Sequence, residues 1–439
     1  MTAPTRPWFW LAVYLVLVST PLVVLILAPV PAKGGFWWEA GIALGFAGLI
    51  MMSLQFALTG RLRFATAPFG IDVIYYFHRF LAYALLLIVL AHPVFLLLDN
   101  PGLLDDLHPD RISWPIFSGV ASLGLLLLLV ISSAFRKTIR LPYNRWLRIH
   151  LLLALAAVAS GFAHMWAIGY YSATPSLQWL WGLIALSVLA ATVHVRLVRP
   201  WLMTRKPWKI RELTPEQGES WTVDLTPEGH AGLDFQPGQF AWITVDASPF
   251  AMREHPFSLS SAPRADGSVE FTIKELGDFT NRIGQFPVGT TVYVDGPYGV
   301  FSMDRHPQAP GYVFIAGGIG VAPVLGMIRA LAERGDQRPH LLFGAHSQWD
   351  RVPRRDELSA LASRLNLTSV PVLEDPPPGW TGEQGWMTRE MLERHLPENY
   401  REMQYFICGP QAMTKAVEGF LHELGVPMRR IHTELFDMA

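Results

Sequence analysis

Long apolar runs dominate the first two hundred residues of the chain. Each of six runs is close to the ~20 residues that a helix needs to cross hydrocarbon. They cover residues 8–30, 36–58, 73–98, 114–135, 146–168 and 177–197. The pattern predicts a six-helix transmembrane bundle over residues 1–200. The first run is too long for a signal-peptide core and no small-residue cleavage site follows it, so we expect a retained span.

The pattern of apolar positions changes after residue 200. Five strand-like segments, WKIREL, WTVDLTP, FAWITV, VEFTIKE and TVYVDGP, follow one another with turn residues between them. They predict a small antiparallel β-barrel over residues 207–305. Residues 308–439 then alternate strand and helix, beginning with YVFIAGGIGVAPVLGMIRALAER. A buried strand, a glycine-rich turn and a helix in this order predict a Rossmann-like α/β nucleotide domain.

Basic residues gather in alternate connections between the apolar runs. The connections at 59–72 and 136–148, and the exit after residue 197, are rich in arginine, whereas those at 31–35, 99–113 and 169–176 are not. Short cytoplasmic loops carry an excess of Lys and Arg, so this asymmetry places both termini in the cytoplasm. The sequence therefore predicts a multi-pass protein of the cell (inner) membrane.

Composition agrees with a chain that is part membrane bundle and part soluble domain. Of the 439 residues, 51% are hydrophobic and 16% are charged, which is too apolar for a soluble enzyme of this length. The net charge of −1 does not suggest a nucleic-acid partner. The single cysteine, Cys408, excludes an intrachain disulfide framework and cysteine-based zinc or iron–sulfur sites.

Two of the apolar runs each carry a pair of histidines. His78 and His92 lie in the third run, and His150 and His164 lie in the fifth. The members of each pair are fourteen residues apart, about 40° short of four helical turns, so they share a helix face and lie ~21 Å apart along the axis. The third and fifth spans run in the same direction. His78 is therefore expected to face His150, and His92 to face His164.

Facing imidazoles on two helices suit two haem irons, each held by one histidine from each helix. A lone histidine in a span is often a hydrogen-bonded packing residue. If all four imidazoles lacked a partner, however, each would bear the free-energy cost of an unsatisfied polar group in hydrocarbon. A zinc or non-haem iron site needs its ligands within one coordination shell, which two pairs ~21 Å apart do not supply. His194 has no partner at this spacing, so we expect it at the membrane interface, with a haem-propionate contact as the alternative.

The second half of the chain carries short motifs in a particular order. PGQF (237–240), HPFSLSSAP (255–263), KELGDFT (274–280) and GPYG (296–299) precede GGIG (317–320) and CGP (408–410). A glycine-rich turn before a helix is where a pyrophosphate is expected, although alone it is weak evidence. The order of motifs resembles the ferredoxin-reductase superfamily. Joined to six spans with two histidine pairs, it resembles the NADPH oxidase and ferric reductase family in a short bacterial-type form.

The resemblance implies an FAD site built from two segments. In the first, His255 would face the phosphates, Phe257 would pack on the isoalloxazine and Ser258 would approach flavin N5, with Pro256 in the same strand. Relatives usually carry arginine at the first position and tyrosine at the third, and histidine is a weaker, pH-sensitive phosphate partner. In the second segment, backbone amides and a hydroxyl would hold the pyrophosphate. The residues of this second segment are Lys274, Gly277, Phe279 and Thr280.

The resemblance also implies an NAD(P)H site. Its pyrophosphate turn and its strand-end motif beside the nicotinamide correspond to Gly317, Gly318, Gly320, Pro323, Cys408, Gly409 and Pro410. For Cys408 we expect a positional role, with a small buried apolar residue as the alternative. Glu434 is expected near the hydride path. Phe436 resembles the aromatic that covers the flavin until nicotinamide displaces it, with simple packing as the alternative.

The choice between NADH and NADPH stays open at this stage. After the strand-like LLFGAH, the segment SQWDRVPRRDEL carries three arginines that could meet the 2′-phosphate of NADPH, namely Arg351, Arg354 and Arg355. Equally, these arginines could form a solvated helix start paired with Asp356 and Glu357.

The resemblance implies an NAD(P)H-dependent flavohaem oxidoreductase with FAD and two haems b as cofactors. NAD(P)H gives two electrons as hydride whereas haem accepts one at a time, so FAD would divide the pair and electrons would cross the membrane singly. The expected acceptor is dioxygen, giving superoxide. A ferric chelate is the first alternative, and a quinone or an extracytoplasmic partner enzyme is the second. A non-enzymatic haem-binding membrane protein is a further alternative.

Overall fold

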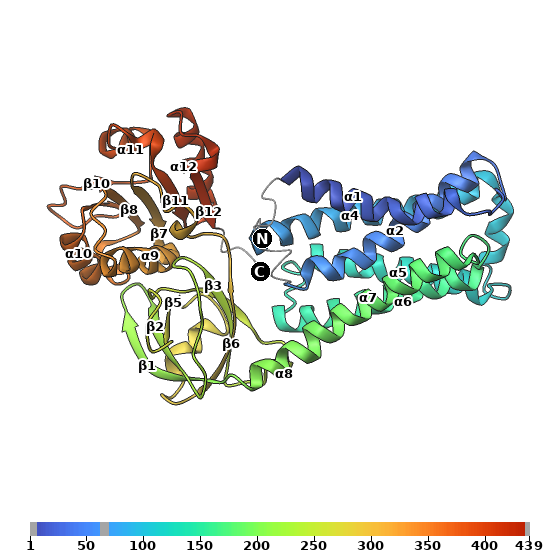
Figure 1. Cartoon of the computed structure of the whole chain (residues 1–439), viewed down its shortest axis with the longest axis horizontal. Helices are drawn as coiled ribbons and strands as arrows, with labels where there is room; N and C mark the ends of the chain where they lie inside the picture. The colour runs from blue at the N-terminus through green and yellow to red at the C-terminus, as the bar shows by residue number, and fades with distance from the viewer. Residues whose placement is uncertain (1–6, 62–69, 435–439) are drawn as a thin grey trace. The chain divides into compact units, whose positions relative to one another are not determined.

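The chain folds into two compact units, Met1–Arg199 and Pro200–Ala439. The computed structural model describes residues 7–61 and 70–434. The first unit is helical, and the second contains two six-stranded sheets (Figure 1). The predicted fold class is thereby confirmed: a six-helix bundle comes first, then an antiparallel barrel, then a Rossmann-like domain.

Six helices among the described residues are long and apolar enough to cross a membrane. They are α1 (Pro7–Leu27), α2 (Phe36–Thr59), α4 (Ile71–Asp99), α5 (Trp114–Ala134), α6 (Tyr143–Ile168) and α7 (Pro175–Val193). The first ends three residues before the expected residue 30, where Pro29 and Pro31 follow and disfavour further helix. A short 3-10 helix, η1 (Pro101–Leu107), lies between α4 and α5.

The sixth span continues beyond its expected end at residue 197. After α7 the chain passes through a π-helical turn, η2 (His194–Val198), into α8 (Arg199–Thr204). Pro200, in α8, has no N–H to continue the ladder of hydrogen bonds, and the π-helical turn, in which the Arg199 N–H donates to the His194 carbonyl, lies directly before it. His194, expected at an interface, begins the π turn and has an exposed side chain.

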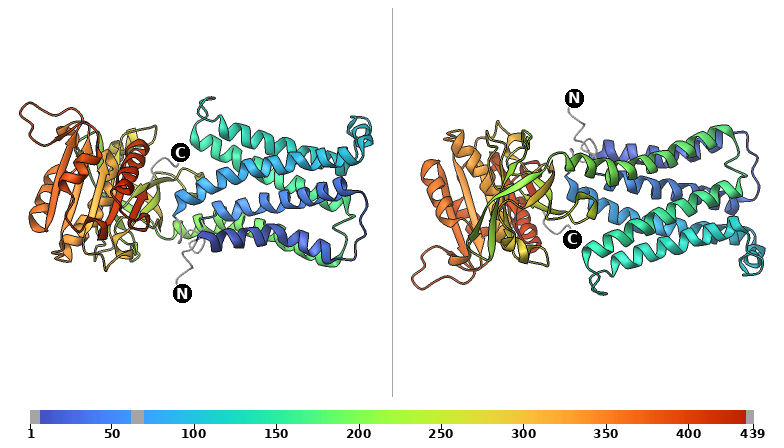
Figure 2. Two further views of the ribbon diagram at one scale, coloured as in Figure 1. Left: turned by 90° about the horizontal axis from the view of Figure 1, so that it is seen from above. Right: turned by 90° about the horizontal axis from the view of Figure 1, so that it is seen from below.

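The helices of the first unit lie side by side in both further views (Figure 2). Helix α2 packs along α4, and α5 packs along α6, so each histidine-bearing helix has a neighbour beside it along its length. Buried apolar side chains fill the space between the helices, among them Phe46, Leu85, Phe162 and Trp181. Packing of the buried apolar side chains therefore determines which helix lies beside each of the two helices that carry the histidine pairs.

The second unit begins with an antiparallel sheet. Its strands are β1 (Trp208–Glu216), β2 (Ser220–Pro227), β3 (Phe240–Val245), β4 (His255–Ser258), β5 (Val269–Lys274) and β6 (Thr291–Tyr298). Their order is β4-β3-β6-β1-β2-β5. An antiparallel bridge between Leu259 and Phe271 joins the continuation of β4 to β5, at the opposite ends of this order, and so closes the sheet into a barrel.

A parallel sheet forms the rest of the second unit. Its strands are β7 (Tyr312–Gly317), β8 (His340–His346), β9 (Leu367–Leu373), β10 (Glu383–Gln384), β11 (Gln404–Cys408) and β12 (Ile431–Glu434). Its helices include α9 (Val321–Glu333), α10 (Arg355–Arg364), α11 (Arg389–His395) and α12 (Gln411–Glu423). The order β10-β9-β8-β7-β11-β12 reverses direction between β7 and β11. Ligands bind at such switch points, beside the carboxyl ends of the strands.

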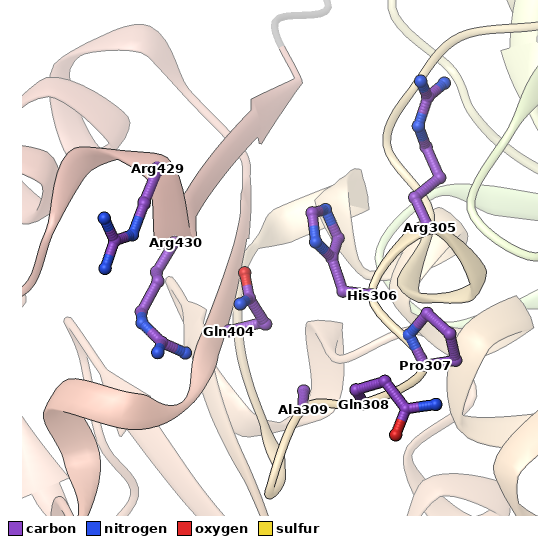
Figure 3. A pocket seen from close by; sticks show the side chains of 8 residues that line it. All are labelled: Arg305, His306, Pro307, Gln308, Ala309, Gln404, Arg429 and Arg430. Carbon is purple, nitrogen blue, oxygen red and sulfur yellow. The ribbon is translucent and has the colours of Figure 1, made fainter. Parts of the chain in front are cut away.

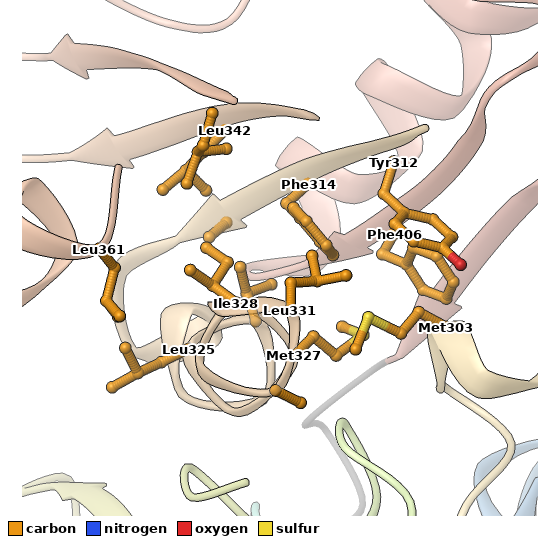
Figure 4. Packing of buried hydrophobic residues seen from close by; sticks show 14 of the residues in the cluster. Met303, Tyr312, Phe314, Leu325, Met327, Ile328, Leu331, Leu342, Leu361 and Phe406 are labelled. Atoms are coloured by element: carbon orange, nitrogen blue, oxygen red, sulfur yellow. The ribbon is translucent and has the colours of Figure 1, made fainter. Parts of the chain in front are cut away.

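A core of large apolar side chains holds α9 against this sheet. Phe314 of β7 and Phe406 of β11 belong to one buried cluster with Leu325, Ile328 and Leu331 of α9, all essentially without exposure to solvent (Figure 4). Burial of a side chain of this size contributes roughly 1.5–3 kcal/mol. The packing fixes the start of α9, and with it the glycine-rich turn, against the ends of β7 and β11.

Candidate functional site

The structure brings the four histidines of the bundle together as two facing pairs. The ring centroids of His78 and His150 are 6.3 Å apart, and those of His92 and His164 are 6.2 Å apart. An imidazole nitrogen binds a first-row transition metal at about 2 Å. Two rings on opposite sides of one metal ion would then have centroids about 6.4 Å apart, so both pairs have the spacing of a shared metal ion.

Hydrogen bonds fix the tautomer of His92 and His164. His92 Nδ1 lies 2.7 Å from the carbonyl oxygen of Gly41, and His164 Nδ1 lies 2.7 Å from that of Pro115. A carbonyl oxygen only accepts, so in each ring Nδ1 carries the proton and donates it. The other nitrogen, Nε2, keeps its lone pair. Metal-ligating histidines characteristically have this arrangement.

His78 and His150 are oriented in the same way by side chains. His78 Nδ1 lies 2.6 Å from the amide oxygen of Gln55. His150 Nδ1 lies 3.1 Å from the hydroxyl of Ser133, which donates its own proton to the Leu129 carbonyl and is therefore an acceptor toward the ring. All four imidazoles thus present an unprotonated Nε2, which is what a metal ion requires of a neutral histidine.

A glycine lies one turn after each of the two carbonyl acceptors. A Cβ at Gly45 would stand 2.9 Å from His92 Nδ1, and a Cβ at Gly119 would stand 2.7 Å from His164 Nδ1. The absence of a side chain at both positions lets α2 and α5 approach the rings closely enough for the carbonyls to bond them. The same arrangement, a carbonyl at position i and a glycine at i+4, orients both His92 and His164.

A buried indole packs on residues that are near His92 and His164 in the fold or in the chain. Trp181 is fully buried and makes edge-to-face contacts with Phe46, which follows Gly45, and with Phe162, which precedes His164 by two residues. Among the described residues its Nε1 has no hydrogen-bond partner. A buried donor normally has one, so the arrangement suits a bound group that carries an acceptor.

In the barrel, two rings of the first flavin segment stack with a ring of the second segment. The His255 ring lies on the Phe279 ring at 4.1 Å with an interplanar angle of 9°, and Phe257 lies 6.1 Å from Phe279. Burial lowers the pKa of His255 to about 4, so the ring is neutral at neutral pH. His255 can therefore give a phosphate a hydrogen bond but not a fixed positive charge. Pro256 pairs with Trp242 of β3 in the sheet.

The second flavin segment is a loop tied to itself by Thr280. The Thr280 hydroxyl accepts from the backbone amides of Leu276 and Gly277, both at 2.9 Å. A Cβ at Gly277 would meet nothing within 4 Å, so the loop is open on that side. Lys274 ends β5 at the start of this loop.

Three buried residues from separate strands meet where the barrel approaches the parallel sheet. Ser258 Oγ of β4 lies 3.5 Å from Glu434 Oε2 of β12. Cys408 of β11 pairs with Glu434 in the parallel register and is completely buried. Burial, together with the Glu434 carboxylate, raises the pKa of the Cys408 thiol well above its usual value. The thiol therefore stays protonated and is not a nucleophile. Phe436 lies outside the described residues.

The glycine-rich turn packs directly on the CGP motif. A Cβ at Gly320 would overlap the Cys408 carbonyl, and a Cβ at Gly317 would stand 2.8 Å from Cδ of Pro410. A Cβ at Gly409 would stand 3.0 Å from Cα and N of Gly317. Gly318, by contrast, has a φ of 54° and open space beside it. Pro323 lies in the first turn of α9, so this turn leads into a helix N-terminus at the strand switch point.

The three arginines considered for NADPH have different surroundings. Arg354 is held by carboxylates of Glu216 at 2.8 Å and Glu357 at 2.8 Å, and by Glu270 at 3.5 Å. Arg355 pairs with Asp356 at 3.0 Å, and the side chain of Arg351 is exposed. Arg354 is therefore occupied by three carboxylates, whereas Arg355 has one carboxylate partner and Arg351 is exposed.

Sequence reasoning missed the partners that orient the histidines. Gln55 and Ser133 are polar residues inside apolar runs, and a polar side chain expected at membrane depth is itself a signal of a specific partner. The carbonyls of Gly41 and Pro115 have no such signal, because every residue carries one. Glycines at 45 and 119 gave only a weak signal, since glycine in a membrane helix often serves helix packing.

Three family models match successive parts of the chain. "Ferric reductase like transmembrane component" matches residues 44–162, "FAD-binding domain" matches 219–302, and "Oxidoreductase NAD-binding domain" matches 314–419. The first match includes three of the four paired histidines, all but His164. The second includes the flavin motifs, and the third includes the glycine turn and CGP.

Curated relatives are similar over about half of the chain. The ferredoxin–NADP reductase B of Sorangium cellulosum is 33% identical over 245 residues, which are 52% of this chain and 92% of that protein. The ferredoxin–NAD(P)(+) reductase component of the naphthalene 1,2-dioxygenase/salicylate 5-hydroxylase systems of Ralstonia sp is 32% identical over 208 residues, 46% of this chain. The chain spans only 61% of the length of that protein, and 64% of a stachydrine N-demethylase reductase subunit of Rhizobium meliloti.

A solved structure of similar fold is a flavohaemoglobin from Malassezia yamatoensis, which contains bound FAD and haem. It matches with a TM-score of 0.50 and 17% identity, over 91% of this chain and 97% of that chain. At this identity the likeness concerns the fold alone.

Proposed function

Because the chain belongs to the family in which a ferric-reductase-like transmembrane component is joined to FAD-binding and NAD-binding domains, we propose that it carries electrons from NAD(P)H through FAD and two haems b to an extracytoplasmic acceptor. It is an oxidoreductase with FAD- and NAD(P)-binding domains in a multi-pass membrane chain. The proposal adds the haems, the direction of transfer and the acceptor.

The observation that carries the proposal is the pair of facing imidazole sites. Both have centroid spacings of 6.2–6.3 Å and all four rings keep Nε2 free. Among the described residues no three His, Cys, Asp or Glu side chains gather around one point, which favours a metal held by two histidines and a macrocycle over a bare ion. A haem held by these histidines would supply one-electron transfer.

At the other end of the path the chain's own residues position hydride donor and flavin. FAD accepts a hydride and passes its electrons on singly when bound. Ser258 offers a hydroxyl beside the Glu434 carboxylate, 3.5 Å away, as a hydrogen-bonding pair in a buried setting. The Gly317–Gly320 turn offers backbone amides for the coenzyme pyrophosphate at the start of α9. Cys408 fills the space beside them without taking part in proton transfer.

We place both termini in the cytoplasm and the His92/His164 pair toward the outer face, from the arginine-rich connections at 59–72 and 136–148. The acceptor we propose is dioxygen, which needs almost no binding site and is reduced at the haem edge to superoxide. The name of the transmembrane family model favours a ferric chelate as the second candidate.

Replacement of one outer histidine tests the haem assignment. His92→Leu is expected to lose about half of the bound haem, because a site with one imidazole left binds haem far more weakly. Reduction of the outer acceptor should stop, while reduction of flavin by NAD(P)H persists. The matched control is His108→Leu, which removes an exposed histidine from the 99–113 connection and should change neither. Full haem content in the His92 variant would refute the assignment.

The acceptor is tested with purified, cofactor-loaded protein. Dismutase-sensitive probe oxidation in air indicates superoxide, and anaerobic formation of the ferrous ferrozine complex indicates ferric-chelate reduction. The protein could consume NAD(P)H in neither assay and do so only after a quinone or an extracytoplasmic protein fraction is added. That result would reject dioxygen as the acceptor and assign the protein an electron-supply role. A protein that neither binds flavin nor is activated by it would overturn the oxidoreductase proposal.

A further inference from the structure

A cavity of about 420 Å³ lies at the edge of the parallel sheet where its strands begin (Figure 3). Its lining residues are Arg305, His306, Pro307, Gln308, Ala309, Gln404, Arg429 and Arg430. Gln404 is the first residue of β11, and Arg430 immediately precedes β12. The glycine turn and Cys408 lie at the opposite ends of the strands, ~13–17 Å away at ~3.3 Å per residue. The cavity is therefore separate from the coenzyme site.

The lining of this cavity is cationic. It contains three arginines and a histidine and no carboxylate. Among the described residues, none pairs with the guanidinium of Arg429, which is exposed. Arg430 donates from Nη1 to the Glu402 carbonyl, while its Nε is buried with no partner among the described residues. Guanidinium donors without acceptors at a concave site leave room for an anion.

The acidic residue that directly precedes Arg305 in the chain is already neutralised. Asp304, two residues before His306, receives two hydrogen bonds from Arg334, at 2.5 and 2.8 Å. Its charge is therefore compensated outside the cavity. Because Asp304 is so engaged, the arginines of the lining keep their positive potential toward the cavity.

The walls of the cavity are held in place before any ligand binds. Arg338 donates to the carbonyls of Pro307 and Ala309, at 3.0 and 2.7 Å. The His306 ring stacks on His432 of β12 at 4.2 Å, and His432 Nε2 lies 2.8 Å from the amide oxygen of Gln404. A preformed site avoids part of the entropy cost of binding. Its volume is in the range of small-molecule sites, about 300–1,000 Å³.

We propose that this cavity is a binding site for a phosphate-bearing anion, recognised by Arg429 and Arg430. Planar guanidinium groups bind phosphate oxygens in a bidentate manner, and a group with two or more negative charges matches the excess of cations. The phosphate is that of a free metabolite or of a lipid headgroup. The site is additional to electron transfer and does not depend on the haem assignment.

Calorimetric titration of full-length, FAD-loaded protein with inorganic pyrophosphate tests the free-anion source. Arg429→Glu should weaken binding at least tenfold, because it replaces an unpaired cation by an anion without breaking an internal contact. Arg364→Glu makes the same charge change at an exposed position on α10 and should leave binding within twofold. The glycine turn can also bind pyrophosphate. Binding to the cavity is therefore measured as the part of the binding heat that Arg429→Glu removes.

Nanodiscs test the lipid source. The melting temperature is compared in discs with phosphatidic acid and in discs of phosphatidylcholine alone. If phosphatidic acid raises it for the wild type and for Arg364→Glu but not for Arg429→Glu, the ligand is a lipid phosphate. Protection by pyrophosphate alone, with the same dependence on Arg429, identifies a free anion. If wild type and Arg429→Glu bind pyrophosphate equally and respond equally to phosphatidic acid, there is no anion site in the cavity. Binding is measured without turnover, so this result leaves the proposed electron transfer untouched.

Discussion

Gly119 lies directly against the imidazole of His164. A methyl group in place of its hydrogen would stand 2.7 Å from Nδ1 and 2.9 Å from Cε1, closer than side chains approach one another. The ring cannot retreat without losing the 2.7 Å hydrogen bond from Nδ1 to the Pro115 carbonyl. The glycine and the carbonyl one turn before it therefore set the position of the ring together.

Gly119→Ala is accordingly expected to disturb the His92/His164 pair alone. Forcing a methyl group into a filled space costs about 1–3 kcal/mol, and loss of an orienting hydrogen bond typically weakens metal binding 10–100-fold. We expect bound haem to fall toward half, measured as pyridine haemochrome per flavin. Gly124→Ala, on the same helix, places its methyl group in open space and should retain full haem. Equal haem in the two variants would mean that Gly119 serves helix packing only.

Replacement of Ser133 tests the His78/His150 pair. Ser133→Ala removes the oxygen that accepts from His150 Nδ1 at 3.1 Å, so a buried N–H is left unpaired at a cost of about 1–3 kcal/mol. We expect a change in the midpoint potential of one haem and slower transfer from flavin to haem, with the other haem unchanged. Spectroelectrochemical titration measures both.

Ser132 supplies the matched control for this experiment. Its hydroxyl bonds the same Leu129 carbonyl, at 3.1 Å, but no contact joins it to His150. Ser132→Ala should therefore have wild-type potentials. A shift of the same size in both variants would show that the helix, and not the histidine, responds to the loss of a hydroxyl.

The histidine pairs were predictable from the sequence and their orienting partners were not. Histidine is rare in apolar runs, and a spacing of fourteen residues puts both members on one face of any helix. The partners depend on how far α2 slides along α4, which packing decides. Gln55 is visible in the sequence as a polar residue, yet nothing local tells that its amide meets His78, 23 residues away.

The arginines after β8 show the same limit. Pairing of Arg354 with Glu357, three residues later, was one of the two expectations and is present at 2.8 Å. The decisive contacts come from the barrel, where Glu216 and Glu270 lie far away in sequence. Long-range ion pairs of this kind have no local pattern, so sequence reasoning could not separate Arg354 from its neighbours.

Acid should weaken the soluble half through buried histidines. Burial, with a smaller effect of the Lys274 charge, lowers the pKa of His346 to about 4. The unfolded chain has the ordinary value of about 6.5, so below that pH it binds more protons than the folded chain and stability falls. The stability is fully present above pH 6.5 and is lost as the pH falls toward 4. Between pH 7 and pH 5 His346 alone accounts for about 2 kcal/mol.

Thermal melting followed by flavin fluorescence measures this effect. The wild-type melting temperature is expected to drop between pH 7 and pH 5, and His346→Gln should reduce the drop because glutamine does not titrate. His422→Gln, at an exposed position of α12, should melt with the wild-type pH dependence. A drop of the same size in all three proteins would assign the acid sensitivity to other groups.

Arg354 and Arg351, three residues apart, are expected to have opposite phenotypes. Arg354→Ala leaves the buried carboxylate of Glu270 with fewer partners and removes the ion pair to Glu216, so the soluble half should lose about 3–5 kcal/mol of stability. Arg351→Ala touches only an exposed side chain and should change stability by less than ~0.5 kcal/mol. If NADPH is the coenzyme, Arg351→Ala should raise the KM for NADPH several-fold and leave that for NADH unchanged, because only NADPH carries the 2′-phosphate. Urea titration and steady-state kinetics with both coenzymes separate the two roles. An equal effect of Arg351→Ala on both coenzymes would leave Arg355 as the remaining candidate for the 2′-phosphate.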